Sequence, residues 1–296
     1  MAEADWLAVR FQEQRAHLRA VAYRMLGSLS EADDAVQNSW LRLSGADTAD
    51  VDNLAGWLTT VVARECLKLL RARRSRREEP LGVHVPEPII AGADRADPEQ
   101  QALLGDSVGL ALLVVLDTLA PAERLAFVLH DMFEVPFEEI APIVGRTPAA
   151  ARQAASRARR RVKGMAPVGD ADLARQREVV GAFLVAAREG DFQALVAALD
   201  PDVVLRVDIG AMPVGASGVV RGAPAVARQA LSYGRRYGQA ARLALVNGAA
   251  GVVAAVRGRP VSVLGFTVRG GKIAEIDILA DPARLPQLDL PDLHDR

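Results

Sequence analysis

Residues 145–163 read GRTPAAARQAASRARRRVK, and this stretch decides how the middle of the chain folds. Gly145 and Arg146 suit a tight turn, Thr147 can cap a helix with its hydroxyl, and Pro148 fits the first helical position. The apolar residues ahead of the turn, within 136–144, have helical spacing. Two short helices joined by such a turn predict a helix-turn-helix.

The helix after this turn is predicted to have two different faces. The face expected to pack on the preceding helix holds Ala151, Ala155, Ala158 and Val162. The opposite face holds Arg152, Gln153, Ser156, Arg157 and Arg160. Arginine can bond guanine and glutamine can bond adenine in the major groove, while further cations bind phosphates. We interpret it as a recognition helix; the alternative, a solvated basic helix, does not account for the turn chemistry.

A second basic cluster lies within residues 53–77, on a helix that Asn53 can cap. Its cations are Arg64, Lys68, Arg71, Arg73, Arg74, Arg76 and Arg77. Trp57 and Thr60 precede them. Cations that follow phosphates, placed beside an aromatic ring that stacks on bases, suit the binding of an opened DNA strand. The alternative is a helix end whose cations favour the negative dipole terminus, with Trp57 in the core.

An acidic, amphipathic segment covers residues 30–40, with Ser30 as the expected helix cap. Taken alone, it is an ordinary surface helix. The chain as a whole has a net charge of -1, so total charge does not indicate nucleic acid. Cys66 is the only cysteine, which excludes a disulfide framework and a CxxC metal site. No signal peptide or membrane-spanning run is recognisable, so we expect a cytoplasmic protein.

Composition and spacing divide the chain into helical units at 1–80 and 106–166, a Pro-rich and acidic linker at 81–105, and a C-terminal domain at 168–296. In the C-terminal domain, helices come first and strands follow, with short hairpin turns between them. This order predicts an antiparallel α+β domain. The expected strands are 203–208, 242–247, 251–257, 261–268 and 273–279.

Three ordered motifs carry a resemblance to a known family. They are SLSEADDAVQNSWLRL (28–43), NLAGWLTTVVARECLKLLRARRSRR (53–77) and LDTLAPAERLAFVLHDMFEVPFEEIAPIVGRTPAAARQAASRARRRV (116–162). Together they resemble domains two and four of an extracytoplasmic-function (ECF) RNA polymerase sigma factor, without an intervening third domain. The resemblance covers about residues 7–165 and implies a non-enzymatic factor that directs promoter-specific transcription initiation.

The same resemblance implies partners for each helix: core RNA polymerase, through its β′ clamp helices and β flap, and promoter DNA. The clamp helices would be bound by Glu31, Asp33, Asp34, Gln37 and Trp40. The −10 element would be bound by Asn53, Trp57, Thr60, Arg64, Lys68, Arg71 and Arg74. The −35 element would be bound by Arg146, Thr147, Ala149, Arg152, Gln153, Ser156, Arg157 and Arg160. Many relatives carry asparagine and aspartate at positions 64 and 68, so this helix is more basic than theirs.

The linker carries a second resemblance. Val85-Pro86-Glu87-Pro88 is similar to the Trp-Leu-Pro-Glu-Pro signature of sigma factors with a C-terminal SnoaL-like extension, the SigJ type, with His84 where the tryptophan would be. This implies that the C-terminal α+β domain is a SnoaL-like, NTF2-like cone. The Asp-Gly-Gly-Gly-Lys motif of that group corresponds here to residues 208–212, Asp-Ile-Gly-Ala-Met, which keep the aspartate and one glycine.

Proton-transfer chemistry in such a cone needs a carboxylate base and an acidic donor in one pocket. The candidates are Asp208, Tyr233, Tyr237 and Asp277. The alternative, which we favour, is that the tyrosines pack the helix on the sheet and the aspartates lie at strand ends. We therefore expect no catalytic residue, metal or cofactor, and a C-terminal domain that regulates the sigma domains in cis. A ligand-sensing repressor with an unknown small ligand, and an enzyme fused to a DNA-binding module, are the competing hypotheses.

Overall fold

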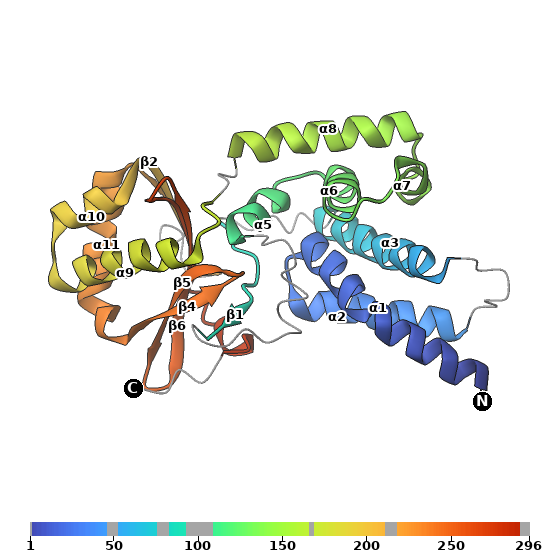
Figure 1. Cartoon of the computed structure of the whole chain (residues 1–296), viewed down its shortest axis with the longest axis horizontal. Helices are drawn as coiled ribbons and strands as arrows, with labels where there is room; N and C mark the ends of the chain where they lie inside the picture. Colours follow the sequence, from blue (N-terminus) through green and yellow to red (C-terminus); the bar gives the residue numbers. More distant parts are fainter. Residues whose placement is uncertain are drawn as a thin grey trace. The chain divides into compact units, whose positions relative to one another are not determined.

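A computed structural model of the chain describes residues 2–45, 53–75, 83–92, 109–165, 169–210 and 218–290 (Figure 1). The chain forms two compact units. The first combines Met1–Glu79 with Val115–Met165, and the second combines Pro80–Val114 with Ala166–Arg296. Each unit is therefore built from two separate stretches of sequence, and the segment expected to be a linker belongs to the second unit.

The first unit is helical, as the sequence predicts. Its first group of helices is α1 (Ala2–Leu26), α2 (Leu29–Ser44) and α3 (Leu54–Ser75). Helix α5 (Leu110–Asp117) runs from the second unit into the first. The second group is α6 (Pro121–Phe127), the π-helical turn η1 (Val128–Met132), α7 (Phe137–Val144) and α8 (Pro148–Met165).

Local signals fix most of these helix ends. Gly145 adopts φ 70° after α7, and the Thr147 hydroxyl accepts the N–H of Ala150 at 3.3 Å, so the predicted helix-turn-helix is confirmed. The expected cap of α2 at Ser30 is wrong. Ser28 is the cap and accepts the N–H of Glu31, because the helix begins directly after the left-handed Gly27.

The two helical groups pack on each other within this unit, where α3 contacts α6 and α7. Arg124 of α6 is 1% exposed, and its Nε donates to the backbone oxygen of Arg24 in α1 at 3.2 Å. Its Nη1 donates to Asp117 at 2.8 Å. On the other side, Arg71 Nη2 donates to the backbone oxygen of Val144 at 3.4 Å. These contacts join the two sigma-like regions directly.

The second unit is an α+β structure, again as predicted. Its helices are α9 (Leu173–Glu189), α10 (Phe192–Ala198) and α11 (Ala223–Tyr237), with the 3-10 turns η2 (Gly238–Ala240) and η3 (Leu285–Gln287). Its strands are β1 (Ile90–Ala91), β2 (Leu199–Asp208), β3 (Gly218–Arg221), β4 (Ala241–Val246), β5 (Ala249–Val256), β6 (Arg259–Arg269) and β7 (Lys272–Leu279). They form one sheet in the order β1-β4-β5-β6-β7-β2-β3.

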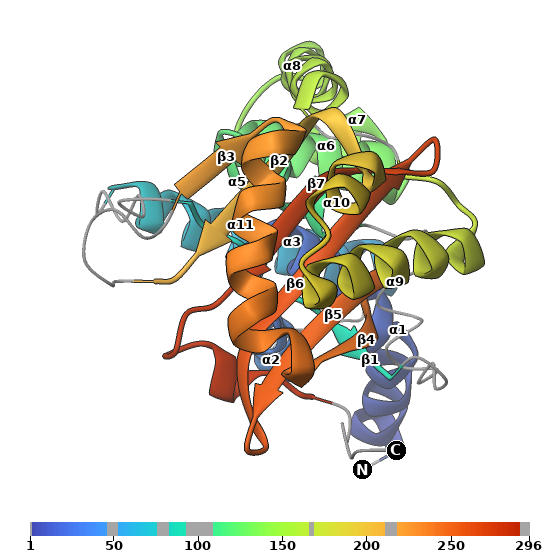
Figure 2. The same ribbon diagram turned by 90° about the vertical axis from the view of Figure 1, so that its left-hand side faces the viewer.

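The prediction of an antiparallel α+β domain holds except at one strand pair. Strands β4 to β7 form an antiparallel meander, but β2 pairs with β7 in parallel, with Arg206 opposite Asp277 and Asp208 opposite Leu279. Strands β1 and β3 were not predicted. Figure 2 shows α9, α10 and α11 across one face of this sheet, where apolar residues such as Phe183, Leu205 and Phe266 form the core.

Two absences hold for the described ranges. None of the helices there is both long and apolar enough to cross a membrane. The described residues also contain no group of three or more His, Cys, Asp or Glu side chains that could hold a metal ion.

Candidate functional site

Helix α8 has the two faces that its sequence predicts. Ala151, Ala154, Ala155 and Ala158 are buried, and α8 packs on both α6 and α7. The opposite side is exposed, as are the turn residues before it. The exposed residues include Arg146, Thr147, Ala149, Arg152, Gln153, Ser156, Arg157 and Arg160. A basic, solvent-facing helix side of this kind is what entry into a major groove requires.

Several arginines of α8 are already bound to acids of the same unit. Arg157 Nε donates to Glu123 at 2.6 Å, and Arg159 Nε donates to Asp131 at 2.6 Å. Arg152 lies 4.0 Å from Glu138 and over the Phe137 ring, 5.1 Å from its centroid. These pairings could not be predicted from the sequence, because the acids lie up to 34 residues before their partners and follow no local periodicity.

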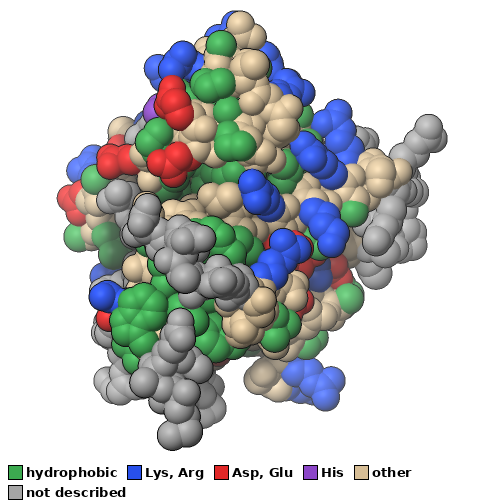
Figure 3. All heavy atoms as spheres, turned by 90° about the vertical axis from the view of Figure 1, so that its right-hand side faces the viewer, with side chains coloured by type: hydrophobic (Ala, Val, Ile, Leu, Met, Phe, Trp, Pro, Cys, Tyr) green, Lys and Arg blue, Asp and Glu red, His purple; other side chains and the backbone are tan. Residues whose placement is uncertain are grey.

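Helix α3 presents the second basic surface along one side. The Asn53 side chain accepts the N–H of Gly56 at 2.9 Å, which confirms it as the cap. Trp57 and Thr60 are half-buried. The exposed cations on the same helix are Arg64, Lys68, Arg71 and Arg74. Figure 3 shows Lys and Arg side chains gathered over the upper and middle part of one face of the molecule.

Helix α2 presents its acidic residues in two ways. Asp33 accepts two hydrogen bonds from Arg19, at 2.6 and 3.1 Å, and Glu31 forms an ion pair with Arg73 of α3. Asp34 and Gln37 are exposed. Trp40 is half-buried, with its ring 5.1 Å from that of Phe11. Asp34 and Gln37 are thus accessible to a partner and Trp40 is partly accessible, while Glu31 and Asp33 also hold α2 against its neighbours.

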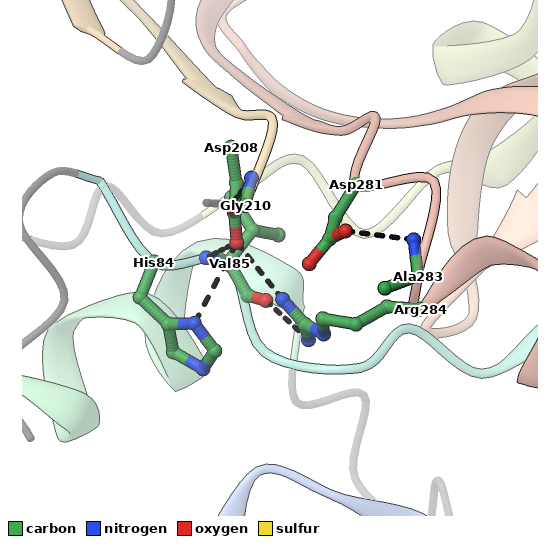
Figure 4. A network of polar contacts seen from close by, with 7 residues as sticks. All are labelled: His84, Val85, Asp208, Gly210, Asp281, Ala283 and Arg284. Atoms are coloured by element: carbon green, nitrogen blue, oxygen red, sulfur yellow. Dashed lines mark hydrogen bonds and ion pairs between the residues drawn. The ribbon is translucent and has the colours of Figure 1, made fainter. Parts of the chain in front are cut away.

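The segment with the Pro-Glu-Pro motif is bound to the second unit through Asp208 (Figure 4). Asp208 is 3% exposed, and its Oδ2 accepts the Val85 N–H at 2.9 Å. Arg284 bridges the two by donating to Asp208 Oδ2 and to the Val85 oxygen, both at 2.8 Å. His84 Nδ1 lies 3.6 Å from the same carboxylate. We call Asp208, Arg284, His84 and Val85 the linker clasp.

The linker continues from the clasp as an edge strand. Pro86 and Pro88 are buried and Glu87 is half-buried. Ile89 then exchanges two hydrogen bonds with Asn247, donating to its side-chain oxygen at 3.0 Å and accepting its backbone N–H at 2.8 Å. Ile90 and Ala91 pair antiparallel with Val246 and Leu245 of β4. Residues 83–92 are therefore a folded part of the second unit.

The four residues considered for a catalytic pocket do not form one site. Tyr233 and Tyr237 pack against the core between helices and sheet, which also holds Leu205 and Ile276. Asp208 and Asp277 occupy the alternate positions of those same two strands, so they face the other side of the sheet. Asp208 binds the linker as described. Asp277 pairs with Arg206 at 3.0 Å, and Arg206 also binds Glu275 at 3.0 Å.

Burial shifts the acidity of several groups. It raises the pKa of the Asp277 carboxyl to about 6, although Arg206 acts in the opposite direction. It also raises the pKa of Tyr233, whose hydroxyl lies 2.8 Å from that of Ser262. In the first unit, Cys66 is buried, and burial raises the pKa of its thiol to about 12.

Comparisons with known proteins match these regions in order. Sigma-70 region 2 matches residues 11–76, and Sigma-70, region 4 matches residues 109–162. The chain is 41% identical over 285 residues to the ECF RNA polymerase sigma factor SigJ of Mycobacterium tuberculosis, covering 92% of this chain and 91% of that one. It is 34% identical to a probable ECF RNA polymerase sigma factor, SigI, of the same species, covering 97% and 98%.

Among solved structures, the fold resembles the crystal structure of the Mycobacterium tuberculosis ECF sigma factor SigJ. The TM-score is 0.78 at 37% identity, and the match covers 96% of this chain and all of that chain. The likeness includes both units, so the α+β unit is part of the shared architecture.

Proposed function

Because the chain belongs to the ECF RNA polymerase sigma factors, we propose that its second unit regulates promoter recognition in cis by holding the linker between the two sigma regions. The family directs transcription initiation by binding core polymerase and promoter DNA, and it is non-enzymatic. The regulatory role rests on one observation above all. Residues 83–92, which connect region 2 to region 4, are bound to the second unit by the linker clasp and by β1.

The surfaces assigned to each partner follow from exposure and charge. Asp34, Gln37 and Trp40 of α2 would contact the β′ clamp helices, and region 4 would meet the β flap. The exposed cations of α3 would bind the opened −10 strand, with Trp57 beside them. We expect the protein to act in the cytoplasm. The exposed side of α8 would enter the major groove of the −35 element.

The first unit has the properties of a resting form. The −10 and −35 positions are about 25 base pairs apart, or about 85 Å of duplex at 3.4 Å per base pair. Helix α3, assigned to the −10 element, contacts the helix-turn-helix assigned to the −35 element, and Arg71 itself donates to Val144. The two regions have to separate before both elements are bound at once.

Separation of the regions depends on the chain that joins them. Its part in the clasp and in β1 is held by several hydrogen bonds to Asp208, Arg284 and Asn247. Residues 83–92 are a part of the connection between α3 and α5, so holding them would limit how far the regions can move. Release of the clasp would set these residues free and favour the open form.

In-vitro transcription with core polymerase tests the proposal in full-length protein. Asp208→Ala and Arg284→Ala each remove clasp contacts. We expect both variants to initiate at the same start sites as the wild type but with an altered yield, and a double variant to resemble either single one because the two residues act through one contact. Deletion of residues 168–296 removes the linker's partners Asp208, Arg284 and Asn247 at once.

Asp200→Ala and Arg269→Ala are matched controls. Each breaks the 3.3 Å ion pair between Asp200 and Arg269 in the same unit. Asp200 lies near the start of β2, whereas Asp208, which binds the linker, is the last residue of that strand. Controls that change the yield as much as the clasp variants would contradict the regulatory role. If no form of the protein, wild type included, initiates at any promoter with core polymerase, the assignment of the DNA-binding surfaces fails as well.

A further inference from the structure

The exposed side of α8 divides into a centre row and two flanks, because successive residues of an α-helix are turned by about 100°. The centre row lies opposite the buried alanines and holds Ala149, Gln153, Ser156 and Arg160. One flank holds Arg157 and Arg161, and the other holds Arg152 and Arg159. Arginines thus border the centre row on both sides.

The flank arginines are tied to the helices beneath them. Arg157 donates through Nε to Glu123, in the first turn of α6, and Arg161 Nη1 donates to the backbone oxygen of Thr118 at 3.3 Å. Across the helix, Arg159 donates through Nε to Asp131 of η1. The centre row is different: for Gln153, Ser156 and Arg160, no such bond to a neighbouring helix occurs among the described residues.

The two closest ion pairs made by α8, Arg157–Glu123 and Arg159–Asp131, share one geometry. In both, the carboxylate takes the Nε–H of the guanidinium at 2.6 Å. The Nη1 and Nη2 groups lie on the other edges of the planar fork, and this is the pair that can bind a phosphate through two hydrogen bonds. A guanidinium anchored at Nε also loses less side-chain entropy when it meets its ligand.

The carboxylates are well placed to act in this way. Glu123 and Asp131 have side chains only 16% and 22% exposed, so the arginines largely cover them. Free carboxylates beside a DNA site would repel phosphates, whereas each of these two carboxylates is paired with an arginine of α8. Glu138, by comparison, is 68% exposed and lies 4.0 Å from Arg152.

We propose that Glu123 and Asp131 are positioning residues that aim Arg157 and Arg159 at phosphates on the two sides of the −35 major groove, while the centre row reads the bases. This inference rests on the proposed function of α8. It separates affinity from sequence preference: flank contacts act on any sequence, and centre-row contacts discriminate among base pairs.

The test uses holoenzyme assembled from full-length protein and core polymerase, with a promoter DNA pool that carries a randomised −35 element. Each variant is assessed by the sequences it selects and by the salt dependence of its affinity for the best one. Arg157→Ala should lower affinity about 8-fold at 0.1 M salt and lower the salt slope by about 0.9, the contribution of one phosphate contact. Gln153→Ala should instead broaden the selected sequences.

The acid variants then distinguish positioning from simple repulsion. Glu123→Ala should weaken binding about 3-fold to 8-fold, close to the loss of one phosphate contact, although it removes a negative charge. Glu123→Gln retains an oxygen that can accept from Nε and should stay within about 2-fold of the wild type, since the hydrogen bond is kept. Asp131→Ala and Asp131→Asn should differ in the same way. Glu138→Ala is the matched control and should change affinity little.

Binding by Glu123→Ala and Asp131→Ala that equals or exceeds the wild type would overturn the inference, because the acids would then only repel DNA. Glu123→Ala should also have no further effect in an Arg157→Ala background, and an additive loss would count against positioning. A different outcome tests the proposed role of α8 itself. If the wild-type holoenzyme selects no −35 sequence from the pool, that role fails, and this inference fails with it.

Discussion

The backbone N–H of Val85 donates to Oδ2 of Asp208 at 2.9 Å, across 123 positions of sequence. One carboxylate, 3% exposed, therefore fixes the point at which the linker enters the second unit. Arg284 completes the arrangement by bonding both residues.

Asp208→Ala should release the start of the linker without melting the edge strand. We expect the Val85 amide to lose most of its protection from hydrogen exchange, because its acceptor is gone, while the Ile89 amide stays protected by Asn247. Residue-resolved hydrogen exchange on the full-length protein measures both. Equal loss at both amides would mean that the clasp and β1 are one cooperative element.

Gly210→Ala should disturb the clasp from a neighbouring position. Gly210 has φ +68°, and a Cβ there would overlap the carboxylate of Asp281. We expect a loss of about 1–3 kcal/mol in the stability of the second unit. Gly258→Ala is the matched control: φ is +74° there, but no atom lies within 4 Å of the added Cβ, so only the backbone cost applies. Denaturant unfolding of both variants, followed by hydrogen exchange in β2, separates the two contributions.

Labelling of the Cys66 thiol should measure unfolding of the first unit, because Cys66 is the single cysteine of the sequence. Its thiol is buried and its pKa is raised to about 12, so almost none of it is thiolate at pH 8. We expect a thiol reagent at pH 8 to leave the native protein unlabelled and to label it at once in denaturant. Rapid labelling under native conditions would show that the helices around α3 open readily.

Asp117→Ala should destabilise the first unit strongly. Arg124 is 1% exposed and would be left without its carboxylate partner, and leaving a buried charge unpaired in this way costs about 3–5 kcal/mol. The labelling rate of Cys66 should rise by about 100-fold or more, since 1.36 kcal/mol corresponds to a factor of ten. Glu13→Ala, which breaks an exposed pair with Arg10, should change the rate less than about 5-fold. Similar rates for the two variants would contradict this account.

The second unit should lose stability as pH rises from about 4 to about 6. Burial raises the pKa of Asp277 to about 6, whereas the unfolded carboxyl titrates near 3.9. In this window the folded state binds more protons than the unfolded state, so the free energy of unfolding falls with rising pH, by up to about 3 kcal/mol. Carbon-13 titration of aspartate carboxyls should show one midpoint near pH 6 that disappears in Asp277→Asn. An unchanged stability profile in this variant would refute the assignment.

Local chemistry made much of this fold predictable. Thr147, Pro148 and the alanines of α8 each determine their own helical position, and the hairpins of the meander follow from neighbouring residues. The sequence did not reveal β1, because two apolar residues in a Pro-rich segment show no alternation. The parallel pairing of Arg206 with Asp277 was also missed, since it joins strands 71 residues apart.

The site residues show the same division. Exposure of Arg152, Gln153, Ser156, Arg157 and Arg160 agrees with the helical wheel. The grouping of Asp208 and Asp277 with two tyrosines did not hold, because side chains alternate across a strand and the aspartates fall on the face away from the helices. The contacts of α3 and α8 with DNA, and those of α2 with polymerase, stay predictions.

The two units alternate along the chain: residues 80–114 of the second unit are inserted between the two stretches of the first. The second unit cut out as residues 167–296 alone would lack β1 and the linker half of the clasp. For the same reason, neither unit can be transplanted to another protein with a single cut. A donor of the second unit has to supply its own linker, or leave the edge of β4 open to pairing with other chains.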